Sequence, residues 1–361
     1  MNILISGGGT GGHIFPALSI ADALKRRFPD AKFLFVGALG RMEMERVPAA
    51  GYEIVGLPVA GFDRKRLWRN IPVAFKLVKS MWKARKVVRD FKPDIAIGVG
   101  GYASGPTLKA AQRVGIPTLV QEQNSYPGVT NRILARKAGA VCTAYHHLER
   151  FFPADKIVFT GNPVRKTLTE TTLTQAEAKK KLGFNPALPL VLVVGGSLGA
   201  RTINMAMAAG IRKLDTDIQV LWQTGRNGAE LGREAAEGLA HVQATPFIAD
   251  MATAYRAADL VVSRAGAGTI SELELLGKAA VLVPSPNVSE DHQRHNAEAL
   301  ANNDAAVMIL DVDAVEKLPE EINQLINHPE RRAQLEKNIR KMACENSDER
   351  IADQVVKLLN L

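Results

Sequence analysis

The chain of 361 residues is long enough for two domains that each bury a hydrophobic core. Its formal net charge of +9 indicates an anionic partner, such as a phosphorylated substrate, nucleic acid or anionic lipid. The only cysteines are Cys142 and Cys344, which argues against a disulfide framework or a cysteine metal site. No apolar run approaches the roughly 20 residues of a membrane-spanning helix, and no signal-peptide pattern opens the chain. We therefore expect a soluble, cytosolic protein.

A glycine-rich loop near the N-terminus is the most informative motif, and it reads Gly7-Gly8-Gly9-Thr10-Gly11-Gly12-His13. It follows the apolar run Ile3–Ile5 and precedes a helix predicted from Pro16 to about Phe28, because proline fits a first helical turn. A glycine turn between a strand and a helix directs backbone N–H groups and a helix N-terminus at an anion.

The same loop fits the dinucleotide-binding fingerprint, which requires a carboxylate after the second strand to hold the ribose. The second predicted strand, Lys32–Val36, ends in Gly37-Ala38-Leu39-Gly40 without an acidic residue. The loop is therefore predicted to contact phosphate or sugar, and a nicotinamide-dependent dehydrogenase is disfavoured.

Short apolar strands alternate with helical patterns through the first half, which predicts a parallel sheet covered on both faces. The predicted strands are Ile3–Ile5, Lys32–Val36, Glu53–Leu57, Asp94–Val99, Thr118–Gln121, Val141–Thr143 and Ile157–Thr160. Ligands of such sheets bind beyond the carboxyl ends of the strands. Three polar loops follow strands there, Gly7–His13, Gly100–Pro106 and Glu122–Ser125, and we expect them to form one site.

Residues 64–92 combine many cations with few acids. Apolar residues recur at helical spacing beside a stripe of lysines, in the sets Ile71, Phe75, Val78, Trp82 and Lys76, Lys79, Lys83, Lys86. An apolar ridge flanked by cations is typical of a helix that rests on an anionic membrane. In the alternative, Phe75 and Trp82 belong to the core. Nucleic-acid binding is less favoured, since exposed aromatic platforms are not evident.

The alternation of predicted strands and helices is interrupted near Thr160–Arg165 and resumes at Leu190–Val194, which indicates a second domain. That strand enters a second glycine loop, Gly195–Arg201. Further strands are predicted at Gln219–Gln223, Val242–Thr245, Leu260–Ser263 and Ala280–Pro284. The fold class is therefore α/β, with two Rossmann-like halves.

A third glycine loop, Arg264–Gly268, leads into a helix that runs to about Leu276. Glu272 in its first turns either stabilises the helix dipole or accepts hydrogen bonds from a ribose diol. His292 and His295 form no pattern specific for a metal, so none is predicted.

Seven blocks together resemble the MurG family, the N-acetylglucosaminyltransferases that convert lipid I to lipid II: Gly7–His13, Gly100–Pro106, Glu122–Asn131, Gly161–Arg165, Gly195–Arg201, Arg264–Glu272 and Asp291–Ala297. The resemblance implies the GT-B fold, in which two Rossmann-like domains with parallel sheets face a central cleft. It implies an acceptor- and membrane-facing domain at 1–163, which a C-terminal helix at about 341–361 would complete. The UDP-GlcNAc-binding domain would span 164–340.

By the same resemblance, the donor sites lie mainly in the second half. Ile248 would hold the uracil through its backbone and Glu272 the ribose. Asn124 and Gln293 would contact the sugar. The diphosphate would lie on Arg165, Ser197 and the helix start at Ala267, Gly268 and Thr269, and the substrate-binding turn would extend through Ile270 and Ser271. Thr10, Gly11 and Gly12 would close on the sugar from the other domain.

The implied reaction is an inverting transfer of GlcNAc to the C4 hydroxyl of MurNAc. His13 is the first candidate base, because imidazole suits proton transfer near neutral pH, and Glu122 is the second. His13 could instead orient a phosphate. Arg165, Ser197 and the helix N-terminus would offset the charge of the leaving group without a metal or cofactor. Arg165 could instead be a hinge residue that pairs with a carboxylate.

The implied partners are UDP-GlcNAc, undecaprenyl-pyrophosphoryl-MurNAc-pentapeptide and anionic membrane lipid, with no nucleic acid. The implied location is the cytoplasmic face of the inner membrane, as a peripheral protein. The alternatives are a UDP-GlcNAc 2-epimerase, a glycolipid synthase and a non-enzymatic basic membrane- or nucleic-acid-binding protein.

Overall fold

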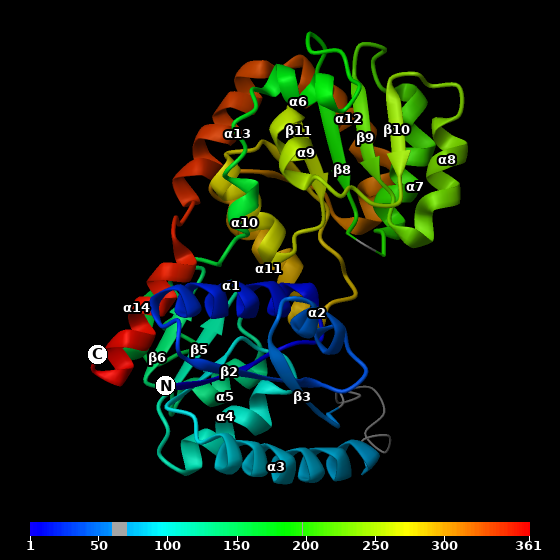
Figure 1. Ribbon diagram of the computed structural model, residues 1–361. Coiled ribbons are helices and arrows are strands. Elements are labelled where there is room, and N and C mark those ends of the chain that lie inside the picture. The colour runs from blue at the N-terminus through cyan, green and yellow to red at the C-terminus, as the bar shows by residue number, and fades with distance from the viewer. Residues whose placement is uncertain (60–70, 197) are drawn as a thin grey trace. The chain divides into compact units, whose positions relative to one another are not determined.

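Parallel β-sheets covered by helices build both halves of this computed structural model, which describes residues 1–59, 71–196 and 198–361 (Figure 1). The chain divides into two compact units, which are Met1–Val164 with Glu345–Leu361, and Arg165–Cys344. The α/β fold class is confirmed. Ser197 lies outside the described ranges, and so do Arg64, Lys65, Arg66 and Arg69, which are four cations of the stretch 64–92.

The first unit contains a seven-stranded parallel sheet in the order β3-β2-β1-β4-β5-β6-β7. Its strands are β1 (Asn2–Ser6), β2 (Lys32–Ala38), β3 (Glu53–Leu57), β4 (Ile95–Gly98), β5 (Thr118–Glu122), β6 (Ala140–Thr143) and β7 (Ile157–Phe159). Each predicted strand is confirmed within two residues at either end. The register pairs Ile3 of β1 with Phe33 of β2 and with Ile95 of β4.

Helices cover both faces of this sheet, as Figure 1 shows. They are α1 (Gly11–Arg27), α2 (Glu43–Ala49), α3 (Ile71–Phe91), α4 (Ser104–Arg113), α5 (Val129–Ala135) and α14 (Ser347–Leu359). Alternate residues of β1 point to opposite faces. Ile3 and Ile5 pack with α1 and α14, whereas Leu4 packs with α3, α4 and α5.

The last helix, α14, packs on α1 in the first unit. Ile351, Ala352 and Val355 are fully buried in the same core as β1. Arg26 and Arg27 of α1 pair with acidic residues in the first turn of α14; the Arg26–Asp348 distance is 2.8 Å. The chain thus returns to its first unit after completing the second.

The first helix differs from the sequence prediction, because it begins at Gly11 and not at Pro16. Thr10 is the extended N-cap, and Gly11 and Gly12 are already helical. Pro16 therefore lies within the helix, and the Gly12 carbonyl loses an N–H partner. The earlier start places His13 in the first turn of α1.

The second unit contains a six-stranded parallel sheet in the order β10-β9-β8-β11-β12-β13. Its strands are β8 (Leu190–Val194), β9 (Gln219–Gln223), β10 (Val242–Thr245), β11 (Leu260–Ser263), β12 (Ala280–Leu282) and β13 (Val307–Met308). The sequence prediction omitted β13, whose two residues are too few to show a pattern.

Eight helices of the described chain belong to this unit: α6 (Gln175–Lys181), α7 (Arg201–Gly210), α8 (Ala229–Ala236), α9 (Met251–Ala257), α10 (Ala267–Leu276), α11 (His292–Ala301), α12 (Ala314–Asn327) and α13 (Pro329–Met342). Helices α7 and α12 pack together over the β8 and β9 face, where Trp222 is fully buried. Short 3-10 turns lie at Ala154–Lys156, Lys166–Leu168, Ile211–Lys213, Arg226–Gly228, Ser289–Asp291 and Asp311–Asp313.

Candidate functional site

Three polar loops of the first unit meet at the carboxyl edge of its sheet, because β1, β4 and β5 are adjacent strands. Gly101 has φ +84°, and a Cβ built on it would lie 2.3 Å from the Gly8 carbonyl oxygen. A Cβ on Gly7 would lie 2.1 Å from Val99 Cγ2. The first two loops therefore pack backbone to backbone, and only glycine fits at these positions. The three loops therefore follow adjacent strands at one edge of the sheet, and that they form one binding site stays a prediction.

His13 projects from the first turn of α1 into this loop cluster. Its Nδ1 lies 3.1 Å from the Gly8 carbonyl oxygen and 3.3 Å from Thr10 Oγ1. A carbonyl can only accept, so Nδ1 donates to it and Nε2 of the neutral ring carries the lone pair. A Cβ on Gly100 would stand 2.8 Å from Nε2. The glycine at position 100 thus keeps a side chain away from the basic nitrogen.

Glu122, the second candidate base, ends β5 and is 1% exposed. Its Oε1 accepts hydrogen bonds from the backbone N and Nδ2 of Asn124 at 3.0 and 3.1 Å. Its Oε2 accepts from Asn131 Nδ2 at 2.8 Å and from the Gly128 N at 3.2 Å. Burial raises the pKa of Glu122, and these hydrogen bonds partly offset that effect. The carboxyl group therefore organises the loop that carries Asn124.

The second unit places a helix N-terminus at the carboxyl edge of its sheet. Helix α10 follows β11 through Gly266, which is an extended N-cap, and no described side chain caps the helix. Ile270 and Ser271 are buried, and the Ile270 N–H already donates to the Gly266 carbonyl at 3.0 Å. The N–H groups of Ala267, Gly268 and Thr269 precede the first helical hydrogen bond, which is the arrangement that binds anions.

Glu272 lies in the second turn of α10 and contacts two side chains. Its Oε1 is 3.3 Å from Arg165 Nη2, and its Oε2 accepts a hydrogen bond from the Tyr255 hydroxyl at 2.9 Å. Burial raises the pKa of Glu272, whereas Arg165 and Tyr255 lower it. Sequence reasoning missed Tyr255, since one tyrosine in the apolar pattern of α9 gives no sign of a polar role.

Ile248 and Gln293 also lie at this edge of the second sheet. Ile248 follows β10, and its N–H donates to Gln223 Oε1 at 2.9 Å. Gln293 lies in the first turn of α11, and its Oε1 accepts from the Ser285 N at 2.9 Å. Gln223 ends β9 and was not predicted as a site residue. Each unit therefore gathers its own share of the candidate residues at the carboxyl ends of adjacent strands.

Comparisons with known proteins cover both units. The glycosyltransferase family 28 N-terminal domain matches residues 3–143, and the C-terminal domain of that family matches residues 190–355. A relative from Parabacteroides distasonis is 56% identical over 362 residues, which is 99% of this chain and 98% of the relative. One from Bacteroides fragilis is 54% identical over 363 residues, with 99% and 96% covered.

Both relatives are named UDP-N-acetylglucosamine--N-acetylmuramyl-(pentapeptide) pyrophosphoryl-undecaprenol N-acetylglucosamine transferase. The crystal structure of Acinetobacter baumannii MurG is 31% identical to this chain, covers 99% of both chains and gives a TM-score of 0.78. The chain belongs to the MurG family. Its fold is that of MurG and of related two-domain glycosyltransferases.

An exposed apolar surface on α3 adds a second candidate site to this MurG-family chain. Phe75 and Trp82 are each 74% exposed and Val78 is 64% exposed, whereas Ser80, Ala84 and Val88 on the opposite side are buried. The alternative that assigned Phe75 and Trp82 to the core is therefore wrong. The neighbouring Lys76, Lys79, Lys83 and Lys86 are exposed.

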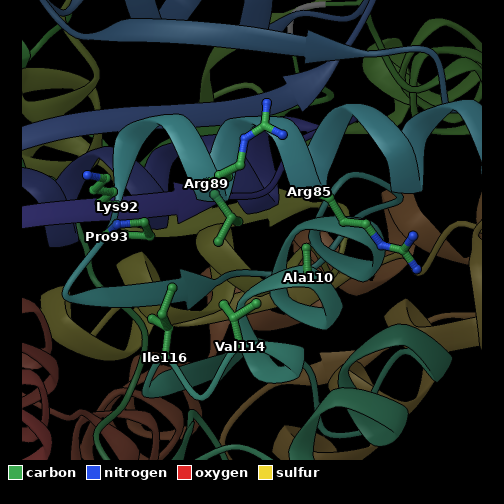
Figure 2. Close-up of a pocket in the computed structure, with 8 residues that line it drawn as sticks. Arg85, Arg89, Lys92, Pro93, Ala110, Val114 and Ile116 are labelled. Carbon is green, nitrogen blue, oxygen red and sulfur yellow. The ribbon is translucent and has the colours of Figure 1, made fainter.

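A basic pocket of about 410 Å³ lies between the C-terminal half of α3 and the C-terminal end of α4 (Figure 2). Its cationic residues are Arg85, Arg89 and Lys92, and its remaining lining is apolar, from Val88, Pro93, Ala110, Val114 and Ile116. In the described part of the chain, no helix is both long enough and apolar enough to traverse a bilayer. The pocket continues the mixed basic and apolar character of α3.

Proposed function

We propose that this protein transfers GlcNAc from UDP-GlcNAc to the C4 hydroxyl of MurNAc in lipid I, undecaprenyl-pyrophosphoryl-MurNAc-pentapeptide, which yields lipid II for peptidoglycan synthesis. The observation that carries this proposal is identity of 54–56% across both units with relatives named for that transfer. A 2-epimerase or a glycolipid synthase is less well supported, because the relatives at 54–56% identity are named for this transfer.

In this proposal the second unit binds the nucleotide. The N–H groups of Ala267, Gly268 and Thr269 and the positive end of the α10 dipole would hold the diphosphate. Ile270 and Ser271 support that turn from the buried side. Ser197 would join them from the second glycine loop.

The uridine would bind through the neighbouring loops. The Ile248 carbonyl would accept the uracil N3–H, and a uracil oxygen would replace Gln223 on the Ile248 N–H. Glu272 would accept the ribose hydroxyls. Gln293 of this unit and Asn124 of the first unit would contact the GlcNAc hydroxyls.

The two roles considered for Arg165 can be combined. In this structure the guanidinium pairs with Glu272, which is the kind of carboxylate partner that the hinge alternative requires. Its side chain is 46% exposed, so it can turn toward a diphosphate without a large desolvation cost. Arg165 would then pair with the phosphate oxygens, whose geometry suits a guanidinium, and release the carboxylate for the ribose.

We assign the base to His13 in preference to Glu122. The C4 hydroxyl oxygen attacks the anomeric carbon of GlcNAc, its proton passes to His13 Nε2, and the bond from that carbon to the UDP oxygen breaks with inversion. Glu122 is less suited, because its carboxyl oxygens already accept four hydrogen bonds within its own loop. Thr10, Gly11 and Gly12 would lie against the reacting sugar from the acceptor side.

Transfer of radiolabelled GlcNAc from UDP-GlcNAc to a lipid I analogue tests this function directly. Formation of a lipid II product with a β linkage is the expected result. UDP binding without transfer would instead point to another acceptor. Conversion of UDP-GlcNAc to UDP-ManNAc in the absence of acceptor would indicate an epimerase and contradict the proposal.

We also propose that α3 attaches the protein to the cytoplasmic face of the inner membrane. Phe75, Val78 and Trp82 would enter the interface, while the adjacent Lys76 and Lys79 would face anionic headgroups at about 1 kcal/mol each. The exposure of Phe75 and Trp82 supports this proposal, since a contiguous exposed apolar surface is unusual unless it binds a partner.

Replacing both Phe75 and Trp82 with serine is expected to weaken binding to vesicles of anionic phospholipid by about 100-fold or more, because burial of each aromatic side chain contributes about 1.5–3 kcal/mol. Sedimentation with the vesicles measures this. Val312→Ser removes an apolar residue that is 86% exposed in the second unit, and this control should bind as the wild type does. Equal binding of the double variant would exclude α3 as the attachment site.

Tyr255→Phe is expected to weaken UDP binding about threefold to tenfold, because one hydrogen bond that orients Glu272 is lost. The loss should be larger at low pH: without the hydroxyl the pKa of Glu272 rises further, so the carboxylate is protonated at a higher pH. Calorimetric titration with UDP at two pH values measures both effects. Tyr52→Phe is the matched control, since that hydroxyl donates to Asp22 in the first unit at 2.6 Å. Unchanged UDP affinity in Tyr255→Phe would remove its orienting role.

A further inference from the structure

Glu43 is a buried carboxylate that sequence reasoning did not select. It is the first residue of α2 and is 1% exposed. Its Oε1 accepts a hydrogen bond from the Ala38 N at 2.8 Å, and its Oε2 accepts one from the Gly9 N at 2.9 Å. The side chain thus ties the end of β2 to the first glycine loop.

The backbone around this carboxylate is shaped to receive it. A Cβ on Gly8 would lie 2.2 Å from Glu43 Oε1, and a Cβ on Gly37 would lie 2.5 Å from Glu43 Cγ. Any other residue at position 8 or 37 would displace the carboxylate. These two glycines therefore have a specific role, which is to admit the side chain of Glu43.

The Gly8–Gly9 peptide connects Glu43 to His13. The N–H of this peptide, on Gly9, donates to Glu43, and the carbonyl of the same peptide, on Gly8, accepts from His13 Nδ1 at 3.1 Å. Both flanking residues are glycines with positive φ, +148° and +93°, so side chains would not oppose rotation of the peptide plane. A rotated plane would present an N–H to the imidazole and a carbonyl to the carboxylate.

We propose that Glu43 is a positioning residue for the transfer reaction: it fixes the Gly8–Gly9 peptide so that the carbonyl holds His13 in the Nδ1–H tautomer, with Nε2 as the base. The oriented peptide also places its negative end toward the imidazolium that forms when Nε2 takes the proton. The catalytic consequence rests on the proposed function, whereas the tautomer itself is a property of the free protein.

Glu43→Gln is the sharpest variant, because it is isosteric and removes one acceptor. Its amide can accept from only one of the two N–H groups and turns its own N–H toward the other. We expect the His13 ring to lose its uniform Nδ1–H tautomer. We also expect kcat to fall about 10–100-fold, with the KM values of donor and acceptor within twofold of the wild type. Glu45→Gln, an exposed glutamate on the same helix, should change neither quantity.

The tautomer is measured by ¹⁵N–¹H correlation spectra of the free protein labelled at its seven histidines, with His13 assigned from His13→Gln. An Nδ1–H signal for His13 in the wild type and its loss in Glu43→Gln support the proposal even if the acceptor is not lipid I. An Nε2–H tautomer in the wild type, or unchanged His13 signals in folded Glu43→Gln, would overturn it.

Glu43→Asp keeps the negative charge but places the carboxylate one methylene further from the Gly9 and Ala38 N–H groups. This variant replaces Glu43→Gln in the test if the glutamine variant does not fold. An intermediate tautomer population and an intermediate kcat support positioning. A purely structural residue would lower the melting temperature without moving the tautomer, and that result, or failure of both variants to fold, overturns the proposal.

Discussion

His13→Gln is expected to lower kcat for GlcNAc transfer about 10²–10⁴-fold, which is the usual contribution of a positioned general base. Glutamine retains a hydrogen-bonding side chain but cannot take up the proton of the C4 hydroxyl. UDP affinity should change little, since the groups proposed to bind uridine and diphosphate belong to the second unit. Steady-state kinetics with a lipid I analogue, together with UDP titration, separate these quantities.

The pH profile distinguishes a base from a residue that only orients substrate. The wild-type rate should fall on the acid side as the imidazole takes up a proton and its basic nitrogen is lost. The pH–rate profile of His13→Gln should lack this decrease at acidic pH, the acid limb. His328→Gln, which changes an exposed histidine between α12 and α13, should behave as the wild type does. A reduced rate that retains the acid limb would assign His13 to orientation only.

The sheet of each unit could be predicted from the sequence because its strands are short, apolar and bounded by glycine turns. A strand that is buried on both faces is a nearly uninterrupted apolar run, such as Leu190–Val194. Because helices alternate with these strands along the chain, neighbouring strands are expected to run parallel. The start of α1 was mispredicted for a related reason. Glycine lowers helix propensity, but here Thr10 ends the extended segment and the helix begins directly after it, at Gly11 and Gly12.

The loops at the carboxyl edges could be predicted because strand topology alone brings them together. The side chains that hold these loops in position could not be predicted. Glu43, Tyr255 and Gln223 act through contacts between segments far apart in the sequence, such as Gly9 and Glu43, which are 34 positions apart. A buried acid at the start of an amphipathic helix has the same local pattern as a surface acid that stabilises the helix dipole.

For α3 the sequence was compatible with two arrangements, in which the aromatic face of the helix is either exposed or buried in the core. The burial of its residues in the structure decides between them. Helical spacing of Phe75, Val78 and Trp82 is compatible with a core face or with an exposed one. The helix needs only the narrow stripe of Ser80, Ala84 and Val88 to pack on the sheet. Its aromatic face therefore remains exposed, which periodicity alone could not determine.

Glu272→Ala is expected to weaken UDP-GlcNAc binding about 10²–10⁴-fold. A carboxylate that accepts two hydrogen bonds from a ribose diol contributes about 1.5–3 kcal/mol for each. The substitution also removes the partner of Arg165 and leaves the Tyr255 hydroxyl without its acceptor. Titration with UDP and with uracil measures the effect, and uracil should bind equally to the wild type and the variant because it lacks the ribose.

Glu274→Gln supplies the matched control two residues further along α10. Burial raises the pKa of Glu274 to about 8, so its side chain is largely protonated at pH 7 and resembles glutamine in shape and charge. UDP affinity should therefore be preserved in Glu274→Gln at pH 7. If Glu272→Ala binds UDP as tightly as this control does, the ribose contact is refuted. The Glu272 carboxylate would then serve only to hold Arg165 and Tyr255.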